Sequence, residues 1–446
     1  MNVTEIRRRF VDFYTQRNFH LLPRAPMLHP SIPMSFVMSA GLVQVETSLA
    51  HAENRDGDKY VLVQECFRHF DLDRIGTNDL HLSLFEMPGA FVFGPNGKKS
   101  TIKRMWTLAT SVLGIDENRV WASYFTGGEV LYQHVPEDET TRQAWIDLGL
   151  PKNRVVGLGP DDNYWVQGGG INGRQSLRKA GPNTELFFDR GIEKACSNQC
   201  RPGCKCGRFI EFSNSLFICH QQDQSKRTLR PMDEPFAETV IGSERVAMIL
   251  QKAPSVFATD QYRPLIEQID RFITKPKVNG SKVMESKRVI ADHMKALYIL
   301  VKDGAPPPGK NGRERIIKLL IRGVVTRQLL LNIQSRDYLP ALLKTIARLT
   351  DDCDQDSPEV QQRVMAYYTN ESERFLKTIR RGRHQLKRFL EENDGETLSG
   401  SQILYLEKRK GLPHLLAAMM LRDRGLIFSE KEYNEALEDW YRQPHN

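Results

Sequence analysis

The sequence lacks any long hydrophobic run. No apolar stretch of the 446 residues approaches the roughly 18 residues that a membrane-spanning helix needs, and the mean hydropathy is −0.47. The first helix-like stretch, from Thr4, is amphipathic and charged, so it does not resemble a secretory signal. There is no internal repeat and no long low-complexity segment. The sequence therefore excludes membrane, fibrous and disordered classes and predicts two or three globular domains.

The sequence also lacks a strong excess of charge of one sign. Its 63 Lys and Arg against 55 Asp and Glu leave a net charge of +8, which permits a polyanionic partner without requiring one. Two clusters of cations lie in the second half: Lys310, Arg313, Arg315, Lys318, Arg322 and Arg327, and then Lys377, Arg380, Arg381, Arg383, Lys387 and Arg388. Such clusters bind a phosphate backbone, but they also form ordinary solvated helix faces.

Cysteine is scarce, and its odd count of seven argues against a disulfide framework. We therefore expect a reducing, cytoplasmic compartment. Four of the seven fall within eleven residues, at Cys196, Cys200, Cys204 and Cys206. Four thiolates in one short loop provide the ligand set of a structural zinc ion, while the alternative is a loop of reduced thiols. Because the protein would supply all four ligands, we expect no catalytic role for this metal.

The pattern of apolar residues changes between the two halves of the chain. Residues 1–250 contain short strand-like runs, such as 60–63, 84–87, 90–93 and 209–212, interrupted by helical patterns at 3–18, 99–114 and 243–252. This combination predicts an α+β fold in which helices flank an antiparallel sheet. From about residue 260 strands nearly vanish, and amphipathic patterns predict helices at 261–274, 283–302, 312–332, 338–349, 358–393 and 412–425. We place the boundary between 250 and 265 and expect an all-α domain after it.

Three segments of the first half carry motifs that are informative when taken together and in order. The first is Gln64–Arg68 followed by His81–Gly94, the second is Asp162–Trp165 followed by Gly181–Asp189, and the third is Glu238–Val246, which opens a helix. Together they resemble the catalytic core of class II alanyl-tRNA synthetases. The helical half continues the resemblance in Arg288–His293, in the helix from Gly312, and in Gly411-Leu-Pro. The resemblance covers nearly the whole chain and ends where the family's editing and C-terminal domains would begin.

The resemblance implies two domains with different functions. A class II synthetase-like catalytic domain would span residues 1–255, with the cysteine-rich loop at 196–206, and a helical tRNA-recognition-like domain would span 256–446. The implied activity is ATP-dependent formation of an aminoacyl-adenylate from a small amino acid such as alanine, with Mg²⁺, followed by transfer to tRNA. Two alternatives stay open. The same activation could serve a carrier protein, a peptide or a small molecule, or the chain could be a non-catalytic paralogue that binds RNA or protein.

The implied chemistry needs fixed cations, because attack of a carboxylate on the α-phosphorus of ATP passes through a crowded polyanion. The resemblance assigns Arg68 to the α-phosphate and the incoming carboxylate, and Arg245 to the γ-phosphate and one face of adenine. Phe85 would cover the other face, and Glu86 and Gly242 complete the implied ATP site. The implied amino-acid site consists of Trp165, Glu185, Asn214, Glu238 and Val240. The plain alternative is that these residues are ordinary parts of the core and the surface.

The sequence departs from the family's pattern in both halves. The family's Asp-Thr-Gly, whose aspartate holds the substrate's α-ammonium, is Glu238-Thr-Val240 here, which narrows an already small pocket. One methylene matters by about 1–3 kcal/mol in such a pocket, so glycine or another small amino acid becomes an alternative to alanine.

In the helical half, Lys310 and Lys408 stand where the family reads a G·U base pair with an asparagine and an aspartate. A lysine binds phosphate but cannot accept a hydrogen bond as an aspartate does. The residues expected to contact RNA are Lys310, Arg313, Arg322 and Lys408, without the usual identity rule.

Overall fold

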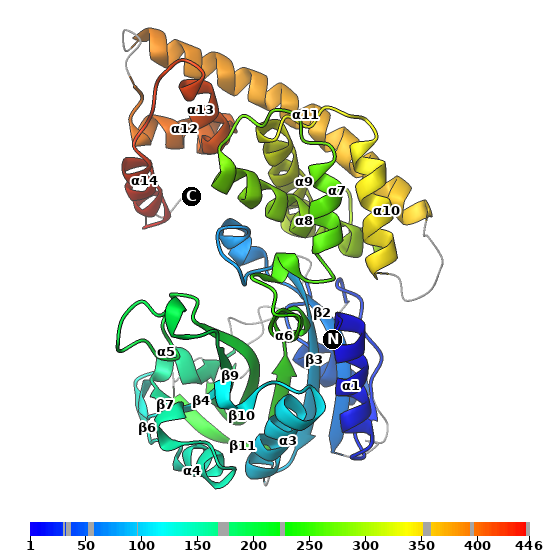
Figure 1. Cartoon of the computed structure of the whole chain (residues 1–446), viewed down its shortest axis with the longest axis vertical. Helices are drawn as coiled ribbons and strands as arrows, with labels where there is room; N and C mark the ends of the chain where they lie inside the picture. The colour runs from blue at the N-terminus through cyan, green and yellow to red at the C-terminus, as the bar shows by residue number, and fades with distance from the viewer. Residues whose placement is uncertain are drawn as a thin grey trace. The chain divides into compact units, whose positions relative to one another are not determined.

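The computed structural model describes residues 1–29, 32, 37–51, 58–95, 97–167, 178–223, 228–350, 358–392 and 397–442. The chain forms two compact units, one of residues 1–72 and 78–263, the other of residues 73–77 and 264–446. The first unit carries the sheet and the second is helical (Figure 1). The predicted fold class, an α+β unit followed by an all-α region, is confirmed. In the described ranges no helix is both long and apolar enough to cross a membrane.

Nine strands of the described residues form one sheet in the order β1-β2-β3-β11-β10-β9-β4-β7, with β8 paired to β9. The strands are β1 (His20–Leu21), β2 (Lys59–Phe67), β3 (Leu84–Phe93), β4 (Val120–Phe125), β7 (Val155–Leu158), β8 (Tyr164–Val166), β9 (Arg178–Asp189), β10 (Phe209–Asp223) and β11 (Thr228–Ile241). The interior pairs are antiparallel, as the sequence predicts, but β1–β2 and β4–β7 at the two edges are parallel. A separate hairpin consists of β5 (Gly128–Val130) and β6 (Gln133–Val135).

The strand register aligns several predicted site residues in one row across the sheet. Glu185 on β9 pairs with Asn214 on β10, Asn214 pairs with Val240 on β11, and Val240 pairs with Gly89 on β3. Because side chains alternate between the two faces of a strand, Glu238 lies on the same face of β11 as Val240. The sheet therefore assembles one site from segments far apart in the sequence.

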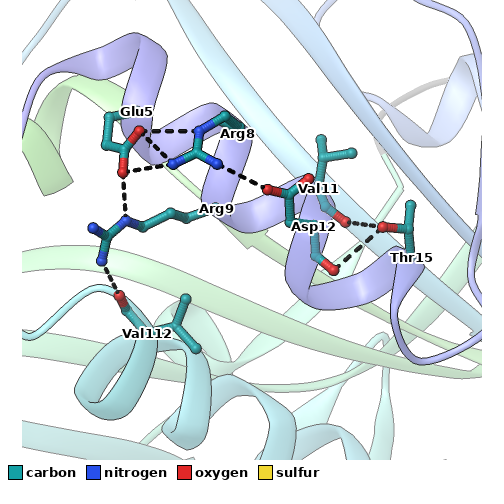
Figure 2. A network of polar contacts seen from close by, with 7 residues as sticks. All are labelled: Glu5, Arg8, Arg9, Val11, Asp12, Thr15 and Val112. Atoms are coloured by element: carbon teal, nitrogen blue, oxygen red, sulfur yellow. Dashed lines mark hydrogen bonds and ion pairs between the residues drawn. The ribbon is translucent and has the colours of Figure 1, made fainter.

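The helices of the first unit are α1 (Val3–Thr15), α2 (Leu42–His51), α3 (Lys98–Thr107), α4 (Glu139–Asp147), α5 (Pro160–Asn163) and α6 (Ser243–Leu250). The first, α1, begins where the Asn2 side chain accepts a hydrogen bond from the Glu5 backbone N–H, an N-cap. Its polar face is cross-linked as Figure 2 shows: Arg9 Nε donates to Glu5 Oε1 at 2.7 Å and Arg9 Nη1 donates to the Val112 carbonyl at 2.9 Å. These bonds fix α1 to the turn that follows α3.

The second unit contains α7 (Arg263–Asp270), α8 (Gly280–Lys302), α9 (Gly312–Leu330), α10 (Tyr338–Thr350), α11 (Pro358–Glu392), α12 (Gly400–Lys410), α13 (His414–Arg422) and α14 (Glu430–Arg442). Its core is built around α8, where Ile290, Met294 and Leu297 are fully buried. The long α11 buries residues at spacings of three and four, as an amphipathic helix does. A capping box of Ser399 and Gln402 starts α12, and Gly411 ends it in the left-handed region, with φ of 68°.

Candidate active site

A cavity of about 250 Å³ lies in the first unit, over β3, β10, β11 and the start of α6. Eight of the predicted site residues line it: Arg68, Phe85, Trp165, Asn214, Glu238, Val240, Gly242 and Arg245. The other lining residues are Ala40, Leu42, Leu80, His81, Leu82, Met87, Glu211, Phe212, Ser213, Leu216, Ile241 and Glu244. The structure thus brings most of the predicted ATP-binding and amino-acid-binding residues together.

Arg68 and Phe85 form a cation–aromatic pair at this cavity. Arg68 directly follows β2, and its backbone N–H donates to the Ser83 carbonyl at 2.8 Å. Its guanidinium carbon lies 5.1 Å from the centroid of the Phe85 ring, within the range of a cation–π contact. The Arg68 side chain is exposed, so its donors are available to an anion in the cavity.

Arg245 approaches the same cavity from the first turn of α6. Its Nη1 donates to the Glu211 carbonyl oxygen at 2.9 Å and to the Glu211 carboxylate Oε2 at 3.0 Å. The side chains are only partly buried, at 27% and 38% exposure, so the pair remains accessible to a ligand. A strand and a helix therefore hold this guanidinium in place.

Glu86 is the predicted ATP-binding residue that the structure does not bring to the cavity. Its carboxylate accepts hydrogen bonds from Arg7 Nε at 2.8 Å and from the Ser243 hydroxyl at 2.7 Å. Its backbone N–H donates to the carboxylate of Glu244. Neighbouring side chains on a strand face opposite ways, so Phe85 reaches the cavity while the buried Glu86 ties β3 to α1 and α6.

Glu185 stands behind the cavity wall, where Asn214 Nδ2 donates to its Oε1 at 3.2 Å. Burial, followed by the nearby carboxylates of Glu211 and Asp162, raises the pKa of Glu185 well above its ordinary value, although Arg245 opposes the shift. The Asn214 Oδ1 atom is buried and has no hydrogen-bond partner among the described residues. An unsatisfied acceptor at a cavity is a position where a ligand's N–H group gains a hydrogen bond.

Glu238 is a buried carboxyl group in the cavity wall, only 4% exposed. Burial, and secondarily the carboxylate of Glu46, raises its pKa to about 8. Two residues further, Val240 faces Gly89: a Cβ added at Gly89 would lie 3.5 Å from Val240 Cγ1. Valine thus fills the space that a glycine at position 240 would leave open. Trp165 packs beside them against the buried cluster of Leu42, Ile218 and Phe236.

Two cavity residues that the sequence did not single out are Glu211 and Ser213. The pairing of β10 with β9 shifts between them, which marks a β-bulge. A bulge inserts an extra residue in one strand, so Glu211 and Asn214, three residues apart, can both reach one side. Ser213 donates its hydroxyl to the Val240 carbonyl at 2.8 Å. The polar residues in the run 211–214 were a sequence signal for a site on this strand. The simple alternation of side chains along a strand does not predict the bulge that turns Glu211 and Asn214 to the same side.

The four clustered cysteines converge in the structure. Their sulfur atoms all lie within 4.8 Å of one another, with 3.2 Å between Cys196 and Cys204 and 3.4 Å between Cys200 and Cys206. Zn–S bonds of about 2.3 Å in a tetrahedron place the sulfurs about 3.8 Å apart, so the four thiols fit a zinc ion. Arg208 braces the loop, because it pairs with Asp189 at 2.6 Å and donates to the Cys200 carbonyl at 3.4 Å.

The predicted RNA-binding residues do not form one free surface on the helical unit. Arg322 pairs with the buried Glu371 at 2.6 Å and lies over the Phe375 ring. Lys408 Nζ lies 3.6 Å from Glu407 Oε1 and 5.3 Å from the ring centroid of Tyr441. Lys310 is exposed, whereas burial lowers the pKa of Arg313. Burial, and after it the charge of Arg322 and to a lesser extent of Arg315 and Lys310, lowers the pKa of Lys318, so cations of the α9 cluster repel one another.

Comparison with known proteins gives a consistent result over the whole chain. The family model of class II (A) tRNA synthetases matches residues 5–444. The chain is 28% identical to the alanine--tRNA ligase of Alkaliphilus metalliredigens over 98% of this chain and 48% of that protein. It is 30% identical to the Leptospira biflexa enzyme of the same name, over 98% of this chain and 46% of that protein. It is also 30% identical to the chloroplastic/mitochondrial enzyme of Oryza sativa subsp. indica, over 98% of this chain and 44% of that protein.

Among solved structures, Staphylococcus aureus histidyl-tRNA synthetase matches with a TM-score of 0.33 and 10% identity, over 60% of this chain and 75% of that one. An Entamoeba histolytica aspartyl-tRNA synthetase matches with the same TM-score and 12% identity, over 58% and 56%. The chain spans about half the length of the curated relatives it matches. On the strength of the family model, which covers it almost from end to end, the chain belongs to the class II (A) tRNA synthetases.

Proposed function

We propose that the chain activates a small amino acid with ATP, forms an aminoacyl-adenylate, and transfers the aminoacyl group to tRNA. The observation that carries this proposal is the convergence of Arg68 and Arg245 on one cavity. They come from segments far apart in the sequence, and the side chains of Phe85 and Asn214 line the same cavity. A merely structural role for two arginines does not require a shared cavity.

The proposed reaction follows from the charges at this cavity. A carboxylate oxygen of the amino acid attacks the α-phosphorus of ATP, and the bond to the bridging oxygen breaks, so that pyrophosphate leaves. Arg68 has a planar fork of donors that can hold the α-phosphate and the incoming carboxylate together. Arg245, fixed by Glu211, neutralises charge on the leaving phosphates. Phe85 and Arg245 offer the two faces between which a purine ring stacks.

The amino-acid half of the proposed site must satisfy an ammonium group, which carries three donors and no acceptor. Among the acceptors that line the cavity, we assign the buried Asn214 Oδ1 and the carboxyl group of Glu238 to this ammonium group. A substrate ammonium stabilises the ionised form of Glu238, whose pKa of about 8 leaves it mostly protonated at neutral pH without a ligand. Val240 limits the space for a side chain, so we propose glycine or alanine as the substrate.

Two metal ions belong to the proposal. Mg²⁺ would accompany ATP and neutralise phosphate charge, and Glu211 is the cavity carboxylate beside Arg245 that would hold it. Zn²⁺ would occupy the Cys196, Cys200, Cys204 and Cys206 cluster, whose sulfur spacing fits a closed tetrahedral site. The zinc would be structural, because a site closed by four protein ligands leaves no position for a substrate.

The acceptor in this proposal is tRNA, in a cytoplasmic setting where the thiols stay reduced. One observation favours a second candidate, the transfer to a carrier protein, a peptide or a small molecule. Lys408, one of the two lysines at the family's base-pair-reading positions, already contacts Glu407, and Arg322 is engaged by Glu371. If tRNA is the acceptor, we propose that it is held through phosphate contacts, for which lysines suffice.

The test is exchange of labelled pyrophosphate into ATP, followed by charging of total tRNA with a labelled amino acid. The proposal predicts exchange with glycine or alanine and acid-precipitable label on tRNA. Exchange without label on tRNA favours the second candidate acceptor. Absence of exchange with every proteinogenic amino acid would leave only a binding role, which calorimetry with ATP would then examine.

A further inference from the structure

The side-chain amide of Asn214 has a partner at one end only. Its Nδ2 donates to Glu185 Oε1 at 3.2 Å, while its Oδ1 is buried and has no hydrogen-bond partner among the described residues. Asn214 lines the cavity of the first unit, whereas Glu185 does not. Leaving a buried acceptor without a partner lowers stability, so stability alone does not explain this arrangement. The donor end of the amide is bonded to Glu185, and the acceptor end is left for a ligand.

The strand register brings Glu185 and Asn214 together. Glu185 on β9 lies directly opposite Asn214 on β10, and Asn214 lies directly opposite Val240 on β11. Side chains of directly opposite residues share one face of a sheet, with Cβ atoms about 4.5–5.5 Å apart. The Asn214 side chain therefore stands between Glu185 and Val240, which lines the cavity. Neighbours in a sheet keep this spacing, so the hydrogen bond joins two groups whose backbones are fixed.

A chain of hydrogen bonds from β4 and α4 fixes the backbone of β9 at Glu185. The Glu185 backbone N–H donates to Ser123 Oγ at 3.1 Å, and Thr184 Oγ1 donates to the Ser123 carbonyl at 2.5 Å. Trp145 Nε1 donates in turn to Thr184 Oγ1 at 2.8 Å. Ser123, Thr184 and Trp145 are all fully buried. Supporting hydrogen bonds of this kind hold the side chains of a binding site within the narrow range of positions that recognition requires.

The surroundings of Glu185 favour its neutral form. Burial first, and then the carboxylates of Glu211 and Asp162, raise its pKa well above the ordinary value, although Arg245 opposes the shift. A neutral carboxyl group still accepts the Asn214 N–H through its carbonyl oxygen. Because it carries no charge, it leaves the positive charge of Arg245 available to the phosphates that the proposed activation brings there. Glu185 is thus suited to act as a hydrogen-bond partner rather than as a counter-ion.

Direct contact between Glu185 and the substrate's ammonium group is the alternative role. Such a contact needs a side chain that reaches the cavity, and Glu185 is not among the residues lining it, whereas Asn214 and Glu238 are. The two roles also differ in what they require of position 185. Direct contact gains from a negative charge, whereas positioning Asn214 requires only an acceptor. A glutamine supplies the acceptor without the charge, so it separates the two roles.

We propose that Glu185 is a positioning residue for amino-acid recognition, which holds the Asn214 side chain so that Oδ1 accepts a hydrogen bond from the substrate's α-ammonium group. An ammonium group has three donors and no acceptor, so the opposite orientation of the amide, with Nδ2 toward the substrate, would offer it nothing. Glu185 itself does not touch the substrate. The inference rests on the proposed activation of glycine or alanine, and it adds the residue through which Asn214 selects a free ammonium group.

The test measures KM values in pyrophosphate exchange by the full chain, with glycine or alanine, whichever the wild type uses better. Glu185→Ala should raise the KM for the amino acid by at least 10-fold, because Asn214 is no longer held, while the KM for ATP should stay within about 3-fold. Glu185→Gln should restore the KM for the amino acid to within about 3-fold of the wild type, because its carbonyl oxygen accepts the same hydrogen bond. Glu185→Leu replaces Glu185→Ala if that variant fails to fold. Glu193→Ala, at an exposed glutamate of the same unit, is the matched control and should change neither KM.

A double-mutant cycle shows whether Glu185 acts through Asn214. Once Asn214→Ala has removed the amide, Glu185→Ala has nothing left to position, so the double variant should have a KM for the amino acid within about 2-fold of Asn214→Ala alone. The proposal is overturned if the two effects multiply, if Glu185→Gln raises this KM as much as Glu185→Ala does, or if Glu185→Ala and Glu185→Leu leave it unchanged. Those outcomes leave wild-type exchange intact, so the proposed function would still stand. Absence of exchange by the wild type would instead overturn the proposed function and this inference with it.

Discussion

Arg245 on α6 donates from one nitrogen, Nη1, to both the carbonyl and the carboxylate of Glu211 on β10, at 2.9 and 3.0 Å. The pair joins the end of the sheet to the start of a helix at the cavity that Arg68 also lines. A guanidinium fixed in this way loses little further freedom when it binds an anion, which is the condition for effective stabilisation of a charged transition state. Glu211 is therefore a positioning residue for Arg245.

We predict that Arg68→Ala and Arg245→Ala each reduce pyrophosphate exchange by at least 100-fold. Loss of one fixed donor to a developing anion costs about 2.7–4 kcal/mol of transition-state stabilisation. Lysine at either position should recover only part of the activity, because it is a point charge without a planar fork. Arg230→Ala, an exposed arginine on β11, is the matched control and should leave exchange unchanged. Wild-type rates in the two alanine variants would contradict the assignment.

Glu238 should make stability depend on pH. Its pKa is about 8 in the folded chain and near 4.3 when unfolded. Between these values the folded state holds a proton that the unfolded state has released. The free energy of unfolding therefore falls as pH rises from about 4.5 to 8, by at most about 1.4 kcal/mol per pH unit, and levels off above pH 8. Glu238→Gln should remove this fall, as urea unfolding at pH 5.5, 7 and 8.5 would show. Parallel curves for both proteins would refute the assignment.

Val240 should set the size limit of the amino-acid side chain. Val240→Gly reopens the space beside Gly89, so we expect the preference for alanine over glycine to rise by about 10–200-fold, the range that one small apolar group supplies. The readout is the ratio of kcat/KM values in pyrophosphate exchange. Val240→Ala should fall between the two proteins. An unchanged ratio in both variants would mean that the side chain of the substrate amino acid does not lie beside Val240.

The cysteine cluster should hold close to one equivalent of zinc per chain. Cys204→Ser should lower the zinc content and the unfolding temperature, since a structural zinc site contributes directly to folding. Cys219→Ser is the control, because Cys219 lies outside the cluster. Mass-spectrometric metal analysis of the purified protein is the measurement. Less than about half an equivalent of tightly held zinc would contradict a closed four-thiolate site.

Glu86 should matter for stability and not for contact with ATP. Glu86→Gln weakens the bonds to Arg7 and Ser243, and we expect a loss of about 1–3 kcal/mol in the free energy of unfolding. The KM for ATP should stay within about 3-fold of the wild type, because the side chain does not line the cavity. A large rise in the KM for ATP with unchanged stability would contradict this account and support a contact between Glu86 and ATP.

The sequence carried much of the fold because its strongest patterns are local. Helices such as α8 and α11 repeat buried residues at spacings of three and four, and the strands β2 and β3 are apolar runs between turn residues. It missed α14, whose buried set among the described residues is Tyr433 alone, so no apolar stripe marks it. It also missed α12, although Ser399 and Gln402 form a capping box at its start and Gly411 ends it. The parallel edge pairs were missed because strand direction at an edge depends on tertiary packing.

The site was predictable to the extent that motif positions bring residues together. Arg68, Phe85 and Arg245 meet at one cavity as expected, while Glu86 turns the other way because neighbouring residues of a strand face opposite sides. Glu211 was missed because a bulge between β10 and β9 sets its direction. The engagement of Arg322 by Glu371 also lies beyond any local pattern, since 49 residues separate the two.

The most direct test of the central claim is pyrophosphate exchange by the wild-type chain across the proteinogenic amino acids. We predict exchange with glycine, alanine or both, and none above background with large side chains, because Val240 and Trp165 confine the cavity. Exchange that is fastest with a large amino acid would contradict the proposed specificity. Absence of exchange with every amino acid, in a protein that is folded and loaded with zinc, would contradict amino-acid activation itself.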